Sequence, residues 1–172
     1  MNFVITHRWC TRPQAAPLVE EYLEDHDPVW VALQRFNAAS EGEFTVPLDP
    51  EPLTLLLSDL SIVFQRLPGW LGGLAHGDSE AELTFASQGT ELKLIAKRSK
   101  DRITLSARSI APDRPLPARY GPVTVPASSF VKGWVDFIVA LLDALVVTDP
   151  ALENDPSYRR YRSAIEAAAS AV

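Results

Sequence analysis

The segment 131–147 is the most hydrophobic stretch of the chain, and it must be either a membrane span or a buried helix. Its charged residues, Lys132, Asp136 and Asp143, are separated by four and seven positions. A helical repeat of about 100° per residue places all three on one narrow stripe. A helix of 17 residues is about 26 Å long, which is shorter than the roughly 30 Å hydrocarbon core of a bilayer. The segment is therefore predicted to be a core helix with one solvent-exposed polar stripe, without contact to a membrane.

The overall composition is that of a folded protein. The chain has 172 residues, of which 47% are hydrophobic and 22% are charged, unlike a disordered segment. A chain of this length can bury about 70% of its surface in one core, so we expect a single domain over residues 1–172. Cys10 is the one cysteine, which excludes an intrachain disulfide. Because the first residues also lack the apolar core of a secretory signal, a cytoplasmic location is expected.

Acidic residues are concentrated in the first third of the chain. Residues 1–60 contain ten Asp and Glu against three Lys and Arg, within a net charge of −6 for the whole chain. Acidic surfaces repel the phosphates of nucleic acids and attract basic proteins. Nucleic acid is therefore not expected as a partner. The predicted partner-binding residues include five grouped acids: Glu20, Glu21, Glu24, Asp25 and Asp27.

Local signals divide the chain into helices and strands. Asp-Pro at 27–28 and 155–156 is an N-cap followed by proline at the first helical position. Three alternating runs separated by short polar turns are typical of an antiparallel meander. Helices are expected over 13–25, 28–38, 53–67 and 131–147 and from 156 onward, and strands over 44–46, 81–87, 90–98, 102–111 and 123–125. The predicted fold class is α+β, in which N-terminal and C-terminal helices pack on a small antiparallel sheet of about three to five strands.

The sequence GWLGGLAHGDSE, at 69–80, contains four glycines and is predicted to be a connector loop. It matches neither the dinucleotide-binding nor the P-loop pattern. Trp70 would be exposed in such a loop, and exposed tryptophan is suited to partner binding. His76, Asp78 and Glu80 could instead converge on a small ligand, which makes them the alternative ligand site.

The remaining candidate groups favour structural roles. Cys10 lies three residues after His7, but this spacing alone indicates a small core residue and not a nucleophile. The acids and His26 between 20 and 27 are typical of a solvated helix face. No metal, cofactor or catalytic motif is recognised. A basic cluster without interleaved aromatic residues favours a charged sheet edge over a nucleic-acid surface; its members are Lys93, Lys97, Arg98, Lys100 and Arg102.

Two functional hypotheses follow. The first is a protein-interaction domain without enzymatic activity, in its most specific form an immunity-like or antitoxin-like inhibitor that binds a basic effector. The second is a small-ligand-binding protein or enzyme whose site lies near 69–80. A homodimer that buries part of the apolar helices at 53–67 and 131–147 is compatible with the first hypothesis.

Overall fold

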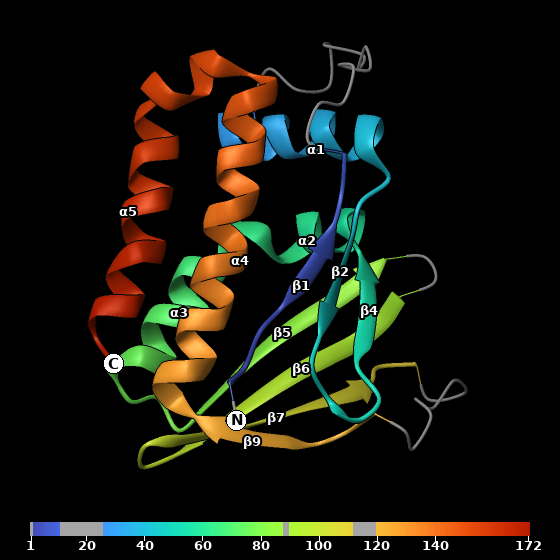
Figure 1. Cartoon of the computed structure of the whole chain (residues 1–172), viewed down its shortest axis with the longest axis vertical. Helices are drawn as coiled ribbons and strands as arrows, with labels where there is room; N and C mark the ends of the chain where they lie inside the picture. The colour runs from blue at the N-terminus through green and yellow to red at the C-terminus, as the bar shows by residue number, and fades with distance from the viewer. Residues whose placement is uncertain (1, 11–25, 88–89, 112–119) are drawn as a thin grey trace.

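The computed structural model of the chain describes residues 2–10, 26–87, 90–111 and 120–172. Within this part, two antiparallel sheets and a set of helices share one cluster of buried side chains (Figure 1). The α+β fold class predicted from the sequence is confirmed. The helix predicted over 13–25 lies outside the described residues, together with Glu20, Glu21, Glu24 and Asp25.

A four-stranded antiparallel sheet in the order β5-β6-β7-β9 forms one side of the protein. Its strands are β5 (Glu80–Ser87), β6 (Thr90–Ser99), β7 (Arg102–Ser109) and β9 (Val123–Pro126). Leu83 lies opposite Leu94 in the first ladder, and Ile103 lies opposite Val125 in the last. The predicted meander and its fourth strand are therefore confirmed.

One face of this sheet is buried and the other is polar, because side chains alternate between the two faces of an extended strand. The side chains that face the core are at most 7% exposed; they are Leu83, Phe85, Leu92, Leu94, Ala96, Ile103, Leu105, Val123 and Val125. On the opposite face, Ile95 is also only 7% exposed. Its neighbours across the two ladders are Glu82 and Ser106, so it is an apolar residue within a polar surface.

A smaller sheet, in the order β1-β2-β4, lies in front of the large sheet in Figure 1. Its strands are β1 (Thr6–Arg8), β2 (Glu43–Val46) and β4 (Leu53–Leu56), and a separate short ladder joins β3 (Asp49–Pro50) to β8 (Tyr120–Gly121). The helix predicted over 53–67 is wrong for its first turn. Leu53 and Leu55 are buried while Thr54 and Leu56 are exposed, because pairing with β2 imposes a period of two.

Helical chain then runs from 57 to 76, through α2 (Leu57–Val63), the 3-10 turn η2 (Phe64–Arg66) and α3 (Leu67–His76). The loop predicted from 69 onward is wrong, because residues 69–76 are helical. Pro68 stands in the first turn of α3, where no intrahelical hydrogen bond is lost. Burial of Trp70 and its apolar neighbours outweighs the roughly 1 kcal/mol that each helical glycine costs. The helix ends at Gly77, whose φ of 113° is left-handed.

The long apolar segment forms α4 (Ala127–Thr148), most of which is buried in the core. Lys132, Asp136 and Asp143 are all exposed, which confirms the predicted polar stripe. Lys132 donates to Asp136 at 2.6 Å, and Arg162 donates to Asp143 at 2.5 Å. None of the described helices combines the length and the apolarity needed to cross a membrane.

The N-terminal segment crosses α4 at a glycine. The Phe3 N–H donates to Ser129 Oγ at 2.8 Å, and the Phe3 side chain is only 3% exposed. A Cβ built on Gly133 would lie 2.3 Å from the Phe3 carbonyl oxygen, so only glycine allows this close approach. The contact fixes the position of the small sheet against α4.

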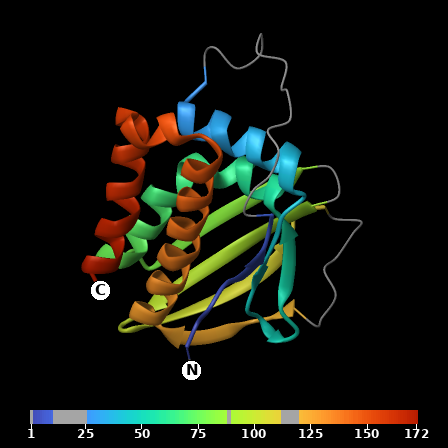
Figure 2. The ribbon, with the colours of Figure 1, turned by 45° about the horizontal axis from the view of Figure 1, so that its top comes forward.

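The remaining helices are α1 (Pro28–Ser40), the 3-10 turn η3 (Pro150–Asn154) and α5 (Pro156–Ser170). Asp27 Oδ1 accepts from the Val29 N–H at 2.9 Å, and Asp155 Oδ1 accepts from the Ser157 N–H at 2.7 Å. Both helix starts predicted from Asp-Pro are therefore confirmed. Figures 1 and 2 show α5 beside α4, and α1 across one end of the protein.

Candidate functional site

The polar face of the large sheet carries paired charges on its first two strands. Glu80 Oε2 lies 3.4 Å from Lys97 Nζ, and Glu82 Oε2 lies 2.8 Å from Lys93 Nζ. Glu80 and Lys97 lie directly opposite in the ladder between β5 and β6, whereas Glu82 and Lys93 are diagonal neighbours, because Glu82 lies opposite Ile95 and Lys93 lies opposite Thr84. The four side chains are 35–63% exposed, so the pairs contribute little to stability. The two glutamate side chains remain 41–47% exposed beside these lysines.

The backbone of β5 is unpaired along its outer edge. The Arg98 N–H donates to the Ser79 carbonyl oxygen at 2.8 Å, which makes these two residues a hydrogen-bonded pair. Because such pairs alternate along an antiparallel ladder, the register directs the outer N–H and C=O groups away from β6 at Glu80, Glu82, Thr84 and Ala86. Since β5 is the first strand in the sheet order, no described residue hydrogen-bonds to these groups. Within the described part of the chain, β5 is therefore an edge strand eight residues long whose outer backbone groups have no hydrogen-bond partner, and α2 and α3 pack against it.

The other edge of the large sheet differs in length and chemistry. β9 has four residues and ends at Pro126, which has no N–H group, and α4 begins at the next residue. Proline at a strand edge blocks further pairing. Of the two edges of this sheet, β5 is the one that could accept another strand.

The residues of the alternative ligand site lie around the turn between α3 and β5. His76, Asp78 and Glu80 are all exposed, but each makes a contact within the protein. His76 Nδ1 lies 2.7 Å from the carbonyl oxygen of Gly72, and Glu80 pairs with Lys97. The side chain of Asp78 lies against Gly73, where a Cβ would be 2.2 Å from Asp78 Oδ2. A ligand role for this group stays a prediction.

The basic cluster does not form a sheet edge, and that prediction is wrong for its β6 members. Lys93, Lys97 and Arg98 lie on β6, which has a strand on each side. The sequence shows strands but does not give their order in the sheet. Arg98 donates to the carbonyl oxygens of Leu74 and Ala75, and so it satisfies carbonyl groups at the end of α3.

Trp70 is a core residue, which contradicts the predicted exposed anchor. Its side chain is 6% exposed because residues 69–76 form a helix and not a loop. The ring packs edge-on against Trp134, with centroids 5.2 Å apart, and against Phe130 at 5.7 Å. Such edge-to-face pairs stabilise a core, so Trp70 has no surface available for a partner.

Asp27 is the one predicted partner-binding acid that the structure describes. It is half-buried, and its side chain caps α1. Burial raises the pKa of Tyr161 well above its usual value, and the negative charge of Asp27 raises it further. The Tyr161 hydroxyl donates to the Phe64 carbonyl oxygen at 2.7 Å. Asp27 therefore has a structural role at the junction of α1 and α5.

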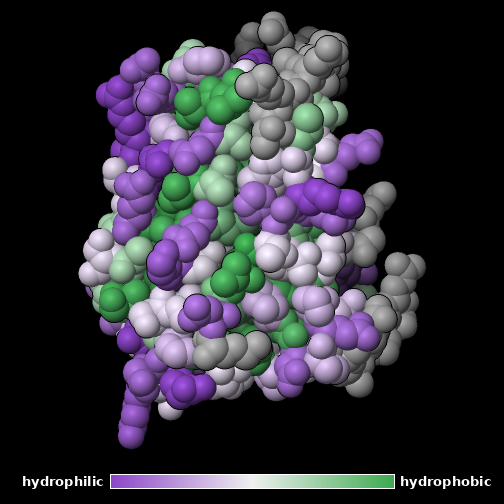
Figure 3. Space-filling view, viewed as in Figure 1, coloured by the Kyte–Doolittle hydropathy of each residue, from purple (hydrophilic) through white to green (hydrophobic). Residues whose placement is uncertain are grey.

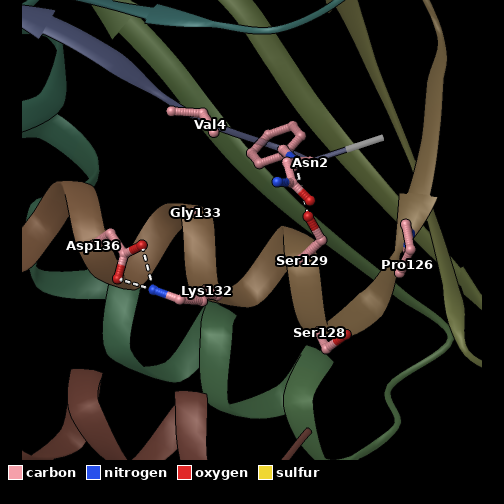
Figure 4. A pocket seen from close by; sticks show the side chains of 9 residues that line it. Asn2, Val4, Pro126, Ser128, Ser129, Lys132, Gly133 and Asp136 are labelled. Carbon is pink, nitrogen blue, oxygen red and sulfur yellow. Dashed lines mark hydrogen bonds and ion pairs between the residues drawn. The ribbon is translucent and has the colours of Figure 1, made fainter.

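An open cavity of about 520 Å³ lies between the N-terminal segment and α4 (Figure 4). The ion pair of Lys132 and Asp136 lines it on one side, and Ser129 is occupied by its hydrogen bond to Phe3. Three of its polar side chains, Ser129, Lys132 and Asp136, are therefore already bonded within the protein. A second cavity of about 370 Å³ lies beside the end of α1, and its lining includes Asn37 and the 54% exposed Leu56.

An aromatic stack of an exposed and a half-buried ring lies at the end of β1. The His7 ring stacks on Trp9 with centroids 3.7 Å apart and planes inclined by 9°. Although much of the residue is exposed, burial of the ring lowers the pKa of His7 below its usual value. Cys10 is exposed, so the prediction that it lies in the core is wrong. Its neighbour in sequence, Trp9, contacts the core, but Cys10 does not follow it there.

The face that carries α4, α5 and the small sheet mixes polar and apolar residues. In Figure 3, hydrophobic side chains form small separate patches among hydrophilic ones. Large apolar residues that remain exposed in the described chain are Val4, Leu56, Ile62, Val147 and Val172. A homodimer stays a prediction.

Comparison with known proteins gives no family to which the chain can be assigned: no protein-family model, no curated protein and no solved structure matches it. Within the described ranges, no group of three or more His, Cys, Asp or Glu side chains is placed to hold a metal ion. The open edge of β5 is the candidate site for which the geometry gives a defined chemistry. Sequence reasoning missed it, although the start of a meander is where such an edge arises.

Proposed function

We propose that this chain is a protein-binding domain that masks a basic effector protein, in the manner of an immunity protein or antitoxin. The observation that carries the proposal is the open edge of β5, where unpaired backbone groups lie beside the carboxylates of Glu80 and Glu82. Backbone edges bind extended protein segments, and carboxylates select basic ones. The net charge of −6 adds long-range attraction for a basic partner.

Inhibition by such a domain needs only a stable complex. Complementary charges speed association and exclude acidic proteins. An effector held at a basic surface cannot present that surface to its own target, which for a basic protein is often a nucleic acid. The chain therefore needs no catalytic group of its own to act.

The test is binding and inhibition with a defined basic protein: the most basic product encoded beside this chain in its genome. Titration calorimetry of the two purified proteins should give a one-to-one complex with a dissociation constant below about 100 nM. Coexpression should abolish the toxicity of that product in growing cells. If the two proteins neither bind nor suppress toxicity, the proposed function is wrong.

A charge-matched pair of variants separates the β5 edge from net charge. Glu80→Lys with Glu82→Lys should weaken binding at least tenfold, because each carboxylate contact at a protein interface typically contributes about 1 kcal/mol or more. Glu153→Lys with Glu166→Lys makes the same change in net charge on η3 and α5 and should weaken binding much less. If both double variants lose the same binding affinity, the effect reflects net charge and not the β5 edge.

A further inference from the structure

We infer that the basic partner binds by adding one extended segment to the open edge of β5, with lysine or arginine at alternate positions facing Glu80 and Glu82. The choice of a basic occupant depends on the proposed function. The docking mode itself depends on the geometry of the edge, and it can be tested separately.

The backbone of β5 offers a complete set of partners for an incoming strand. Four residues direct both their N–H and C=O groups outward, and each can exchange two hydrogen bonds with an added strand; they are Glu80, Glu82, Thr84 and Ala86. At about 3.3 Å per residue, the eight residues of β5 present an edge about 26 Å long. An edge of this length accommodates a segment of six to eight residues (about the usual strand length).

The carboxylates on β5 define which side chains that segment should carry. Glu80 and Glu82 are two residues apart and therefore project from the same face of the sheet. Side chains directly opposite on an added strand would lie about 5 Å away, measured between Cβ atoms. Lys97 and Lys93 lie beside the two carboxylates, but the glutamate side chains remain 41–47% exposed, so a second cation can reach each carboxylate. The favoured sequence is lysine or arginine at two positions separated by one residue.

The same charges disfavour a second copy of this chain as the occupant. Antiparallel pairing of two β5 strands over their full length brings Glu82 of each copy close to the twofold axis, on one face of the joined sheet. Like charges near one another across a ladder are destabilising, and charged edges are a common protection against self-pairing. A basic segment replaces this repulsion by attraction.

The experiment uses nuclear magnetic resonance of the full chain with synthetic peptides of eight residues, the length of β5. One peptide has lysine at two alternate positions among threonine and valine, and a matched peptide has glutamate at those two positions. The lysine peptide, titrated to millimolar concentration, should shift the amide signals of Glu80, Glu82, Thr84 and Ala86 and slow their hydrogen exchange. The glutamate peptide should bind at least about threefold more weakly.

Variants at Thr84 test the hydrogen bonds of the edge. The Thr84 N–H points away from β6, so Thr84→Pro removes an outer donor and preserves the ladder of the sheet. It should weaken binding of the lysine peptide about tenfold, whereas Thr84→Val, which keeps the N–H, should leave binding nearly unchanged. If Thr84→Pro does not fold, Glu80→Gln with Glu82→Gln should remove the preference for the lysine peptide.

Three results would overturn the inference. The first is the absence of any response in β5 to the lysine peptide, and the second is equal binding of both peptides. The third is hydrogen-exchange protection of the β5 edge that rises with protein concentration in the absence of peptide, because this would show that a second copy occupies the edge. If the basic effector binds tightly but Thr84→Pro does not weaken that complex, the docking mode is wrong while the proposed function stands. If the peptide binds as described but no effector does, the function is wrong and the edge still accepts strands.

Discussion

Replacement of Gly133 by alanine gives a stability prediction whose sign depends on one contact. Alanine in place of glycine inside a helix normally stabilises a protein by about 1 kcal/mol. At Gly133, however, the new Cβ would lie 2.3 Å from the Phe3 carbonyl oxygen, and this atom is backbone and cannot rotate away. The N-terminal segment must therefore move off α4.

The cost of that movement follows from the contacts of Phe3. Its side chain is 3% exposed, and loss of its burial costs about 2–3 kcal/mol. Loss of the hydrogen bond from its N–H to Ser129 adds about 1 kcal/mol. After subtraction of the helix gain, Gly133→Ala should lower the free energy of unfolding by about 2–3 kcal/mol, or about 4–12 °C in Tm.

Gly72→Ala is the matched control, because a Cβ on this helical glycine of α3 meets nothing within 4 Å. It should raise the free energy of unfolding by about 0.5–1 kcal/mol. Both variants can be measured by urea denaturation followed by circular dichroism. An increase in stability for Gly133→Ala similar to that of Gly72→Ala would refute the close approach of the N-terminal segment to α4.

Three further predictions concern single side chains. Because burial lowers the pKa of His7 in the folded chain below its ordinary value of 6.5, the unfolded chain binds more protons. The free energy of unfolding should therefore fall as the pH decreases through 6.5 toward the folded pKa. Denaturation between about pH 5 and pH 8 should show this loss in the wild type and a smaller one in His7→Gln. Asp59 is 4% exposed and accepts from Thr90 Oγ1 at 3.1 Å, so Asp59→Ala should cost about 2–3 kcal/mol, and Asp59→Asn less, in thermal unfolding. Arg98→Met should lower stability by about 1–2 kcal/mol because buried carbonyl groups of α3 lose their donor, and faster hydrogen exchange confined to the C-terminal turn of α3 would identify that cause.

Features set by local chemistry were predictable from the sequence. The starts of α1 and α5 depend on Asp27 and Asp155, each of which bonds to N–H groups two and three residues later. The strands of the meander carry their own alternation, and short turns bring neighbours in sequence together. The single polar stripe of α4 likewise depends only on helical spacing. In each case the deciding contacts lie within a few residues.

The errors arose where distant contacts decide the structure. Leu53 to Leu56 fits a helical pattern, but pairing with β2 makes it a strand. Residues 69–73 are rich in glycine, yet burial of Trp70 and Leu71 holds them in a helix. No local signal distinguishes these outcomes, because the partner strand and the core lie elsewhere in the chain.

The candidate site depends on the order of strands, which the sequence shows only in part. A meander makes β5 a neighbour of β6, but it does not reveal whether another strand covers the other side of β5. The sequence pattern places Glu80 in a different candidate site and does not distinguish Glu82 from other exposed acids. Only the register of the sheet shows where the backbone groups of β5 point.

The most direct test of a basic partner is the ionic-strength dependence of its association rate with this chain, measured by stopped-flow fluorescence. The account predicts that the rate constant falls about tenfold or more when salt rises from about 0.05 M to about 0.5 M, because opposite charges attract over the Debye length. Glu80→Lys with Glu82→Lys should flatten this dependence. An association rate that does not change with salt, or that rises with it, would contradict the proposed electrostatic recognition.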